Sequence, residues 1–588
     1  GAAAELYVET HVREDHIHLY GFVDEAERIA VNVNGALLPD AVIRRASDDR
    51  FDAIGQMAGG VAHEMANIFG VIRLALDAAQ LRGTIADTKA FDAVAKATGR
   101  GGALADRMLA LTRDSVWMGG VIDARETAPG KAGRDLYRDS SGEVQRDPAI
   151  NGPLAAGIPG IPAALVHLAE HYGRLPLAQS LAPAIEAAEN GFTSSEHYRT
   201  LVGFRLEAMQ RDAETARLFL RDNQAPETGT LITQPELANT LRAIASNGRD
   251  GFYRGPVAEQ LLRGVQAAGG VWQQQDLDNY RVIERSPIRF SSGGYQVISA
   301  PLPSAGGIAL AGILQALPAL PASPNRSIAQ THQLVELMRR VYRDRAMLLG
   351  DNDFVSVPVA ELTSKAYAVA MAQDINPERA TPSSELGPLR DFHEGTNTTH
   401  FSLMDADGNA VSATLSINLP FGAAFTPPGT GVLLNNEMDD FTVHPGKPNM
   451  FGLIQSSANA VAPGKRPLSS MSPTVLLDED EDVSAVLGTP GGPTIITNVF
   501  QVLIGLQRLG FSPEISVAKP KVHHQCLPDL LYLERAVPVE TEETLRTFGH
   551  RTGRRGSIGD FQLLCQTQER GIVGVSDSRG GGDVSYTN

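Results

Sequence analysis

The fold is decided by the stretch Asn397-Thr-Thr-His-Phe-Ser-Leu-Met404 and its return, Val411-Ser-Ala-Thr-Leu-Ser-Ile-Asn418. Between them, residues 405–409 are rich in Asp, Gly and Asn, which tolerate the backbone angles of tight turns. Two strand-like runs joined by such a cluster predict a β-hairpin.

The two faces of this hairpin differ in character, because side chains alternate along a strand. One face is apolar and contains Phe401, Leu403, Val411, Ala413, Leu415 and Ile417. The other is polar and contains Thr398, His400, Ser402, Ser412, Thr414, Ser416 and Asn418. Alternation alone favours the simplest interpretation, a polar face in contact with water.

The bulk composition describes a globular protein of more than one domain. The chain has 588 residues, of which 43% are hydrophobic and 20% charged, and single cores rarely exceed roughly 250 to 300 residues. A formal net charge of −17 argues against nucleic-acid or anionic-membrane partners, which need a basic surface. Small molecules are therefore the expected partners.

Cysteine and histidine usage predicts neither a disulfide framework nor a metal centre. Cys526 and Cys565 permit at most one bridge, and no Cys/His cluster has the spacing of zinc ligands. We expect no metal and no cofactor. The sequence has no apolar run of about 18 residues and no signal segment, so the chain is expected neither to span a membrane nor to be visibly secreted.

The pattern of apolar residues changes along the chain. Residues 1–48 alternate in short runs that suggest a few strands, without indicating a class. Residues 49–115 carry apolar side chains every three or four positions, which predicts a helical hairpin. From residue 116 onward the texture is mixed, with helices expected at 165–170, 177–190, 257–268 and 334–349.

The helical hairpin resembles the dimerisation and phosphoacceptor region of two-component histidine kinases. The resemblance rests on residues 51–67, in which His63 is followed by Glu64 and then Asn67. It implies that His63 accepts a phosphoryl group, with Glu64 as its acid/base neighbour. The alternative is a hairpin that only packs or dimerises.

Motifs across the last third of the chain, in order and at family spacing, resemble gamma-glutamyltransferases, whose small subunit begins at a Thr-Thr-His-(Phe/Tyr)-Ser sequence. These motifs include residues 435–441, 465–474, 490–492 and 523–525. Weaker matches occur upstream at residues 125–129, 157–160, 251–255, 276–280, 303–307 and 342–345. Together they cover about four-fifths of the chain.

The resemblance implies an α+β fold, the four-layer αββα sandwich of N-terminal-nucleophile hydrolases, here with the additional N-terminal helical hairpin. It implies a precursor that cuts itself between Asn397 and Thr398 into two fragments that remain a heterodimer. Residues 116–397 would form the large-subunit region and residues 398–588 the small-subunit region. Family members of this kind are periplasmic or extracellular, whereas the missing signal segment leaves a cytoplasmic location open.

The implied reaction is γ-glutamyl transfer from glutathione and other γ-glutamyl amides, or their hydrolysis, through an acyl-enzyme on Thr398. The acceptors would be amino acids, peptides or water. A hydroxyl nucleophile needs a base, and the α-amine freed at Thr398 supplies one, because its ordinary pKa is about 7.7 to 8.0. By the same resemblance Ser416 supports the nucleophile, where many relatives carry Thr.

Substrate-binding roles follow from the same correspondence. Arg125 would hold the substrate α-carboxylate, aided by the hydroxyls of Ser469 and Ser470. The α-ammonium would be received by Asn418, Glu437 and Asp440.

Gly491 and Gly492 precede Pro493 and a run with helical apolar spacing. Their N–H groups could therefore form an oxyanion hole at a helix N-terminus. The alternative is an ordinary turn before a helix. Residues 442–463 match the flexible lid of bacterial relatives, with Phe451 where some carry Tyr.

Two rival interpretations remain. Family members usually begin with a Gly-Gly-Asn-Ala-Val-Asp-Ala-Ala-like helix and a glycine-rich strand, and this chain has neither. It could therefore be an unprocessed, inactive fusion product that serves as a scaffold or signalling module. Alternatively, it could be a related acylase that acts on glutaryl or cephalosporin-type amides.

Overall fold

The computed structural model describes residues 120–321, 327–386, 398–405, 408–443, 453, 456–567 and 569–586, and the backbone of residues 5–12, 15–23, 29–33 and 36–37. The chain divides into two compact units, Gly1–Ile54 and Gly55–Asn588. Within the described residues, no helix is both long enough and apolar enough to cross a bilayer.

The first unit is a four-stranded antiparallel sheet in the order β1-β2-β3-β4. Its strands are β1 (Glu5–Val12), β2 (Asp15–Val23), β3 (Ile29–Val33) and β4 (Ala36–Leu37). The helical hairpin predicted for 49–115, with His63, Glu64 and Asn67, lies outside the described residues. Phosphotransfer and dimerisation through this hairpin therefore remain predictions.

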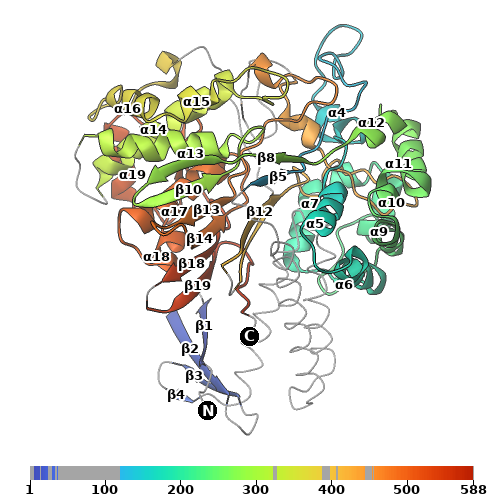
Figure 1. Ribbon diagram of the computed structural model, residues 1–588, viewed down its shortest axis with the longest axis horizontal. Coiled ribbons are helices and arrows are strands. Elements are labelled where there is room, and N and C mark those ends of the chain that lie inside the picture. The colour runs from blue at the N-terminus through green and yellow to red at the C-terminus, as the bar shows by residue number, and fades with distance from the viewer. Residues whose placement is uncertain are drawn as a thin grey trace. The chain divides into compact units, whose positions relative to one another are not determined.

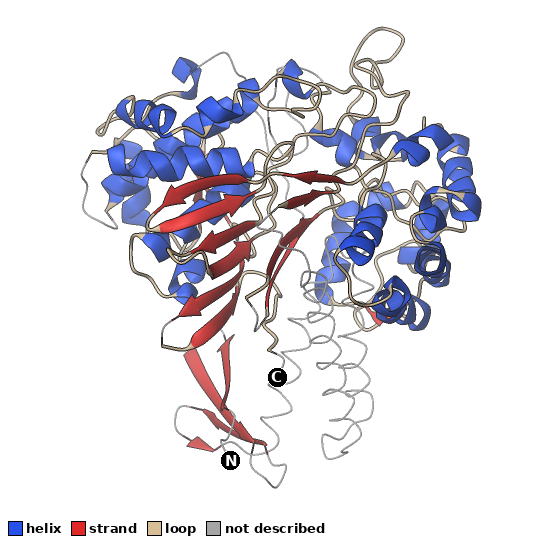
Figure 2. Ribbon diagram, in the orientation of Figure 1, coloured by secondary structure: helices blue, strands red, loops and turns tan. Residues whose placement is uncertain are grey.

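A six-stranded antiparallel sheet forms the centre of the second unit, in the order β19-β18-β14-β13-β10-β9 (Figures 1 and 2). Its strands are β9 (Ile288–Ser292), β10 (Tyr295–Ser299), β13 (Thr474–Leu477), β14 (Val483–Gly488), β18 (Gln562–Thr567) and β19 (Gly571–Ser576). Strands from both predicted subunit regions thus share one sheet, joined where β10 pairs with β13.

The predicted hairpin is present as β11 (Thr399–Met404) and β12 (Ala410–Leu415), with Phe401 opposite Ala413. Its polar face lies against the six-stranded sheet instead of water. Ser412 Oγ donates to the carbonyl of Leu487 at 3.0 Å and accepts from the N–H of Thr474 at 3.0 Å. The hydroxyls on this face are therefore used to hold two sheets together.

Close approach between these sheets depends on one glycine. A Cβ atom at Gly488 of β14 would lie only 2.2 to 2.7 Å from the imidazole ring of His400. That ring also contacts Thr414 Oγ1 at 2.9 Å and Ser402 Oγ at 3.2 Å. His400 is thereby fixed between the strands, two residues after Thr398.

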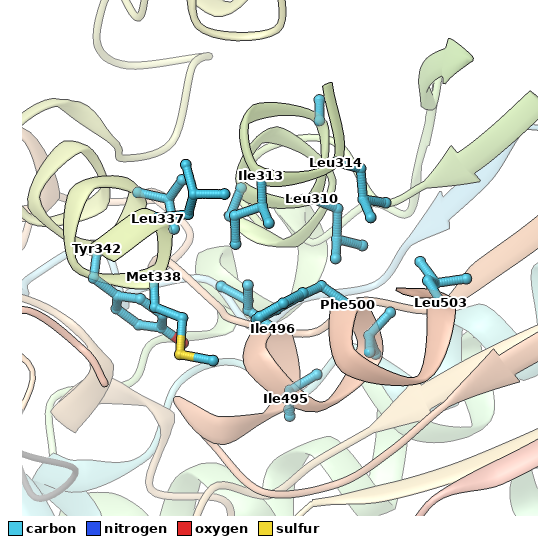
Figure 3. Packing of buried hydrophobic residues seen from close by; sticks show 14 of the residues in the cluster. Leu310, Ile313, Leu314, Leu337, Met338, Tyr342, Ile495, Ile496, Phe500 and Leu503 are labelled. Carbon is cyan, nitrogen blue, oxygen red and sulfur yellow. The ribbon is translucent and has the colours of Figure 1, made fainter. Parts of the chain in front are cut away.

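Helices cover the outer face of the six-stranded sheet. They are α13 (Gly306–Ala316), α17 (Thr494–Gln507) and α18 (Pro513–Ala518), with α14 (Ile328–Leu348) packed over α13. Figure 3 shows Leu310 and Ile313 of α13 above Ile496 and Phe500 of α17. These side chains belong to the largest apolar cluster, which also contains Leu487 of the sheet.

A second group of helices packs on the apolar face of the hairpin, where Phe401 and Leu415 contact the cluster formed by α5, α6, α9 and α11. The order helix, sheet, hairpin, helix confirms the predicted αββα arrangement. Within the described residues, the second β layer is small, because the hairpin pairs with no further strand.

The expected helices are confirmed with small differences at their ends. They correspond to α5 (Ile161–His171), α6 (Leu177–Asn190), α11 (Gly255–Ala267) and α14. The other α-helices of the described residues are α4 (Asp147–Ile150), α7 (Glu196–Met209), α8 (Ala213–Phe219), α9 (Pro235–Asn247), α10 (Asp250–Tyr253), α12 (Gln274–Asn279), α15 (Val359–Leu362), α16 (Lys365–Gln373) and α19 (Val539–Thr547).

Several short strands pair outside the six-stranded sheet and the hairpin. They pair as β5 (Val121–Asp123) with β8 (Ile283–Arg285), β6 (Phe192–Thr193) with β7 (Leu231–Ile232), and β16 (Leu531–Glu534) with β15 (Val522–His523) and β17 (Thr552–Arg555). Both cysteines are free thiols, so the optional disulfide does not form.

Phe500 of α17 is 0% exposed, so we expect its truncation to lower the stability of the folded chain strongly. Phe500→Ala should lower the free energy of unfolding by about 3 to 5 kcal/mol, because it leaves a cavity in the core. Phe204→Ala is the matched control, since that ring is 57% exposed. Denaturant unfolding measures both, and equal effects of the two substitutions would contradict this account of the core.

Candidate functional site

A small pocket at the start of β11 brings together residues that are far apart in the sequence. Its lining is Arg125, Arg345, Thr398, Ser416, Asn418, Asp440, Leu453, Ser469, Ser470, Met471, Gly492, Pro493 and Ile495. All the predicted site residues except Glu437 and Gly491 are therefore in the wall. Asn397 and Phe451 lie outside the described residues.

Arg125 is one of two buried arginines among the described lining residues of this pocket, and the other is Arg345. Arg125 follows β5 and is only 9% exposed. Its Nη1 lies 2.6 Å from Glu437 Oε2, and its Nη2 lies 2.5 Å from Asp440 Oδ2. Residues predicted to bind opposite ends of a substrate thus pair with each other, because buried charges require a partner.

The two ion pairs of Arg125 differ in geometry. Nη2 donates a hydrogen bond to Asp440, whereas both carboxylate oxygens of Glu437 lack a hydrogen-bond donor in the described chain. The 2.6 Å contact with Glu437 is therefore an ion pair without hydrogen-bond alignment. A buried carboxylate in this condition is suited to receive a further donor.

The backbone of Arg125 is held by residues from two other motifs. Its carbonyl accepts hydrogen bonds from the Tyr280 hydroxyl at 2.9 Å and from Arg466 Nη1 at 2.6 Å. Its N–H donates to Asp123 Oδ1 at 2.9 Å. Tyr280 and Arg466 lie in stretches that the family resemblance matched without assigning them a role.

Three carboxyl groups surround this one guanidinium, since Glu126 Oε2 lies 3.9 Å from Arg125 Nη1. Burial raises the pKa of Glu126 to about 7, against the lowering effect of Arg125. Burial also raises the pKa of Glu437, and the nearby Glu126 and Asp440 add to this effect. For Arg125, burial lowers the pKa, but the three carboxylates together outweigh it. Such an acid-rich site can accommodate a further cation.

Ser416 and Asn418 lie just after β12, beside the first residues of β11. Ser416 Oγ accepts from the N–H of Asn418 at 2.8 Å, and Asn418 Nδ2 donates to the carbonyl of Asn436 at 2.9 Å. Because the amide nitrogen is already used, Oδ1 is the acceptor that Asn418 can offer. Its positive φ of 74° is one of the conformations that Asn tolerates best among non-glycine residues.

The serine pair lines the wall that contains Met471. Ser469 Oγ accepts from the N–H of Met471 at 3.0 Å, and the Ser469 carbonyl accepts from the N–H of Ala305. Ser470 Oγ is buried and has no hydrogen-bond partner in the described chain. Its hydroxyl is therefore available to a polar group in the pocket.

Gly491 and Gly492 form a tight turn at the start of α17, as predicted. Both have positive φ angles, of 134° and 54°, and their carbonyls accept from the N–H groups of Thr494 and Ile495. A Cβ atom at Gly491 would lie 2.3 Å from Thr494 Oγ1, so only glycine fits there. Within the described chain, neither glycine N–H donates a hydrogen bond. The turn thus presents donors at a helix N-terminus.

A buried cluster elsewhere has residue types that could bind a metal. Among the described residues, one ligand atom each from His332, Glu336 and His550 lie within 4.8 Å of one another. However, His332 Nδ1 contacts His550 Nε2 at 2.8 Å, and Glu336 pairs with Arg340. Arg339 Nη2 faces His550 Nδ1 at 3.4 Å, where a metal-bound histidine would normally meet an acceptor. A hydrogen-bond network explains this cluster better than a metal site.

Comparison with known proteins gives a consistent result. Residues 108–587 match the family model described as gamma-glutamyltranspeptidase. The glutathione hydrolase proenzyme of Pseudomonas sp. (strain A14) is 40% identical over 434 residues, covering 73% of this chain and 75% of the relative. The protein of the same description from Escherichia coli (strain K12) is 37% identical over 469 residues, covering 79% and 81%.

A solved structure shows the same fold at lower identity. The cephalosporin acylase from Bacillus halodurans superposes with a TM-score of 0.70 at 22% identity, covering 92% of this chain and 94% of that protein. At this level of identity the similarity concerns the fold alone.

The raised pKa of Glu126 predicts a pH-dependent stability. Between its ordinary pKa near 4.5 and its value of about 7 in the folded chain, the folded chain binds more protons than the unfolded chain. The free energy of unfolding then decreases as the pH rises through this window. Glu126→Gln should remove this contribution, so its melting temperature relative to wild type should rise between about pH 5 and about pH 8.

Thermal melts across this pH range provide the measurement. Glu143→Gln is the control, because Glu143 lies on an exposed turn. A difference between Glu126→Gln and wild type that stays constant with pH would show that Glu126 keeps an ordinary pKa.

Proposed function

The chain belongs to the gamma-glutamyltranspeptidase family, and we propose that it hydrolyses glutathione and related γ-glutamyl amides and transfers their γ-glutamyl group to acceptor amines. One observation carries the proposal. A single pocket combines the hydroxyl of Thr398, at the start of a strand, with the guanidinium of Arg125 and the carboxylate of Asp440. These are the groups needed to attack one end of a γ-glutamyl unit while binding the other.

In this proposal Thr398 becomes a chain end when the Asn397–Thr398 bond is cut. The resulting fragments, residues 1–397 and 398–588, remain together as a heterodimer. The new α-amine takes the proton from the Thr398 hydroxyl as the oxygen attacks the γ-carbonyl. The α-ammonium then donates this proton to the leaving amine. Water or an acceptor amine finally attacks the acyl-enzyme and releases Thr398.

Negative charge develops on the carbonyl oxygen in each tetrahedral intermediate. The free N–H groups of the Gly491–Gly492 turn are the proposed donors, supported by the positive end of the α17 dipole. Ser416 is proposed to support Thr398. It also holds the backbone of Asn418, which orients a second polar group at the pocket.

Substrate recognition is proposed to proceed by exchange of ion pairs. An α-amino acid brings both a carboxylate and an ammonium, so Arg125 can turn from Glu437 and Asp440 to the carboxylate. The two acids, together with Asn418, then receive the ammonium. The total charge of the buried cluster does not change, because the incoming group is a zwitterion. Ser469 and Ser470 are proposed to add hydroxyl donors to the carboxylate.

The same charge count disfavours a glutaryl acylase. A glutaryl group brings a carboxylate without an ammonium, so it would add a fourth carboxylate beside Glu126, Glu437 and Asp440. Burial already disfavours the charged forms of Glu126 and Glu437, and a further carboxylate beside them would add repulsion that an ammonium would offset. The acidic surroundings of Arg125 therefore favour substrates that retain the α-amine.

Replacement of the nucleophile should block both cleavage and turnover. Wild-type protein should give two bands on denaturing electrophoresis, whereas Thr398→Ala should remain a single chain of 62.7 kDa. The control Thr228→Ala, at an exposed loop position, should be cleaved normally. Uncleaved wild-type protein that still turns over γ-glutamyl anilide would refute the proposed mechanism.

Asp440→Asn should discriminate between the two substrate classes. Loss of one charge-assisted contact to the ammonium should lower kcat/KM for a γ-glutamyl anilide roughly 10- to 100-fold. Its des-amino glutaryl analogue should be affected much less, because it has no ammonium to bind. Asp439→Asn is the control, since Asp439 pairs with Arg146 and is absent from the pocket wall. Equal losses for both substrates would contradict the assignment.

A further inference from the structure

Tyr342 connects the long helix α14 to the turn that carries the proposed oxyanion donors. Its side chain is 1% exposed, and its hydroxyl donates a hydrogen bond to the carbonyl of Pro493. Figure 3 shows the ring extending from α14 beside Met338, on the side that faces α17. Pro493 directly follows Gly492, and both residues line the pocket.

A second contact fixes the orientation of this tyrosine. The Tyr342 ring meets the imidazole of His523 edge to face, with centroids 5.8 Å apart and an interplanar angle of 88°. His523 Nδ1 in turn contacts Thr497 Oγ1 at 2.8 Å, in the first turns of α17. The start of α17 is therefore held at Pro493 and at Thr497.

The opposite end of the same segment is held from the hairpin. Gly488, at the end of β14, lies against the imidazole of His400, as described above. Residues 489–492 therefore span two fixed points, one on the strand and one at the helix start. Because the chain between them is short, the position of Pro493 largely decides where the N–H groups of Gly491 and Gly492 point.

We propose that Tyr342 is a positioning residue for turnover, which holds the Gly491–Gly492 turn in the orientation that stabilises the oxyanion. This inference rests on the proposed function. Both acylation and deacylation of Thr398 pass through a tetrahedral intermediate at the same carbonyl. A turn that is displaced by a fraction of an ångström loses stabilisation in both steps, while the α-carboxylate and α-ammonium contacts of the bound substrate are unchanged.

A purely structural role makes a different prediction. If Tyr342 only helped α14 to pack on α17, removal of its hydroxyl would lower stability and leave the kinetics of the folded protein alone. If it shaped the whole pocket, KM would change together with kcat. A selective decrease in kcat is therefore the signature of positioning.

Tyr342→Phe removes the hydroxyl and keeps the ring against His523. We expect kcat for a γ-glutamyl anilide to fall about tenfold, less than the 10²- to 10³-fold loss that follows deletion of an oxyanion donor. KM should change by no more than about twofold, since ground-state contacts are kept. Electrophoresis gives the cleaved fraction, so that kcat is expressed per cleaved molecule.

Tyr253→Phe is the matched control. Tyr253 is also fully buried, and its hydroxyl donates to another proline carbonyl, that of Pro159, at 2.6 Å. It is absent from the pocket wall. Its substitution should lower the melting temperature about as much as Tyr342→Phe while leaving kcat unchanged.

Each outcome decides the question. Unchanged kcat in Tyr342→Phe, a parallel change in KM, or an equal loss in Tyr253→Phe would overturn the proposal. Failure of Tyr342→Phe to fold or to be cleaved, with Tyr253→Phe normal, would assign the tyrosine to folding or maturation and also overturn it. If wild-type protein itself lacks γ-glutamyl turnover, the proposed function fails, and this result is distinct from a failure of the positioning role.

Discussion

The ion pairs of Arg125 with Glu437 and Asp440 are the constraint on which the arrangement of the site depends. They join residues separated by as many as 315 positions in the chain. A buried guanidinium left without a partner is strongly unfavourable, so the loss of either carboxylate would destabilise the folded chain. Once these groups meet, the strand end that carries Arg125 and the turn that carries Glu437 and Asp440 occupy the same wall of one pocket. The pairing of Arg125 with its carboxylate partners therefore also brings the residues of the pocket together.

Local sequence patterns predicted the parts of the fold that depend on local physics. The hairpin of residues 399–415 follows from strand alternation around a turn-forming cluster, and α17 follows from apolar spacing after Gly491-Gly492-Pro493. Alternation alone could not decide whether the polar face of the hairpin meets water. That depends on Ser412 finding partners at Leu487 and Thr474, which come from strands more than 60 residues away.

For motifs that are distant in the sequence, only the family resemblance predicted that they meet in one site. It did not predict the individual contacts between them. The resemblance selected the residues of the pocket, but it gave no reason why Tyr280 and Arg466 matter. The structure gives one, because both donate to the carbonyl of Arg125. Likewise, the resemblance assigns Arg125 and Glu437 to opposite ends of a substrate, and it does not predict that the two side chains pair with each other. Sequence motifs identify which residues meet, whereas the contacts among these residues depend on packing and charge.

The position of the proposed cut explains how cleavage could create a new α-amine at Thr398 while the two fragments stay together. Strand β11 begins at Thr399, so the bond before Thr398 lies outside the β11–β12 ladder. The central sheet crosses between the two fragments where β10 pairs with β13, and the Arg125 ion pairs cross as well. Separation of the fragments would therefore break the central sheet and expose buried charges. The free energy that this requires is far larger than the gain in chain entropy from cutting one peptide bond. Because the hairpin holds Thr398 from its C-terminal side, a new amine at Thr398 would remain beside the Thr398 hydroxyl, in the pocket that Gly492 also lines.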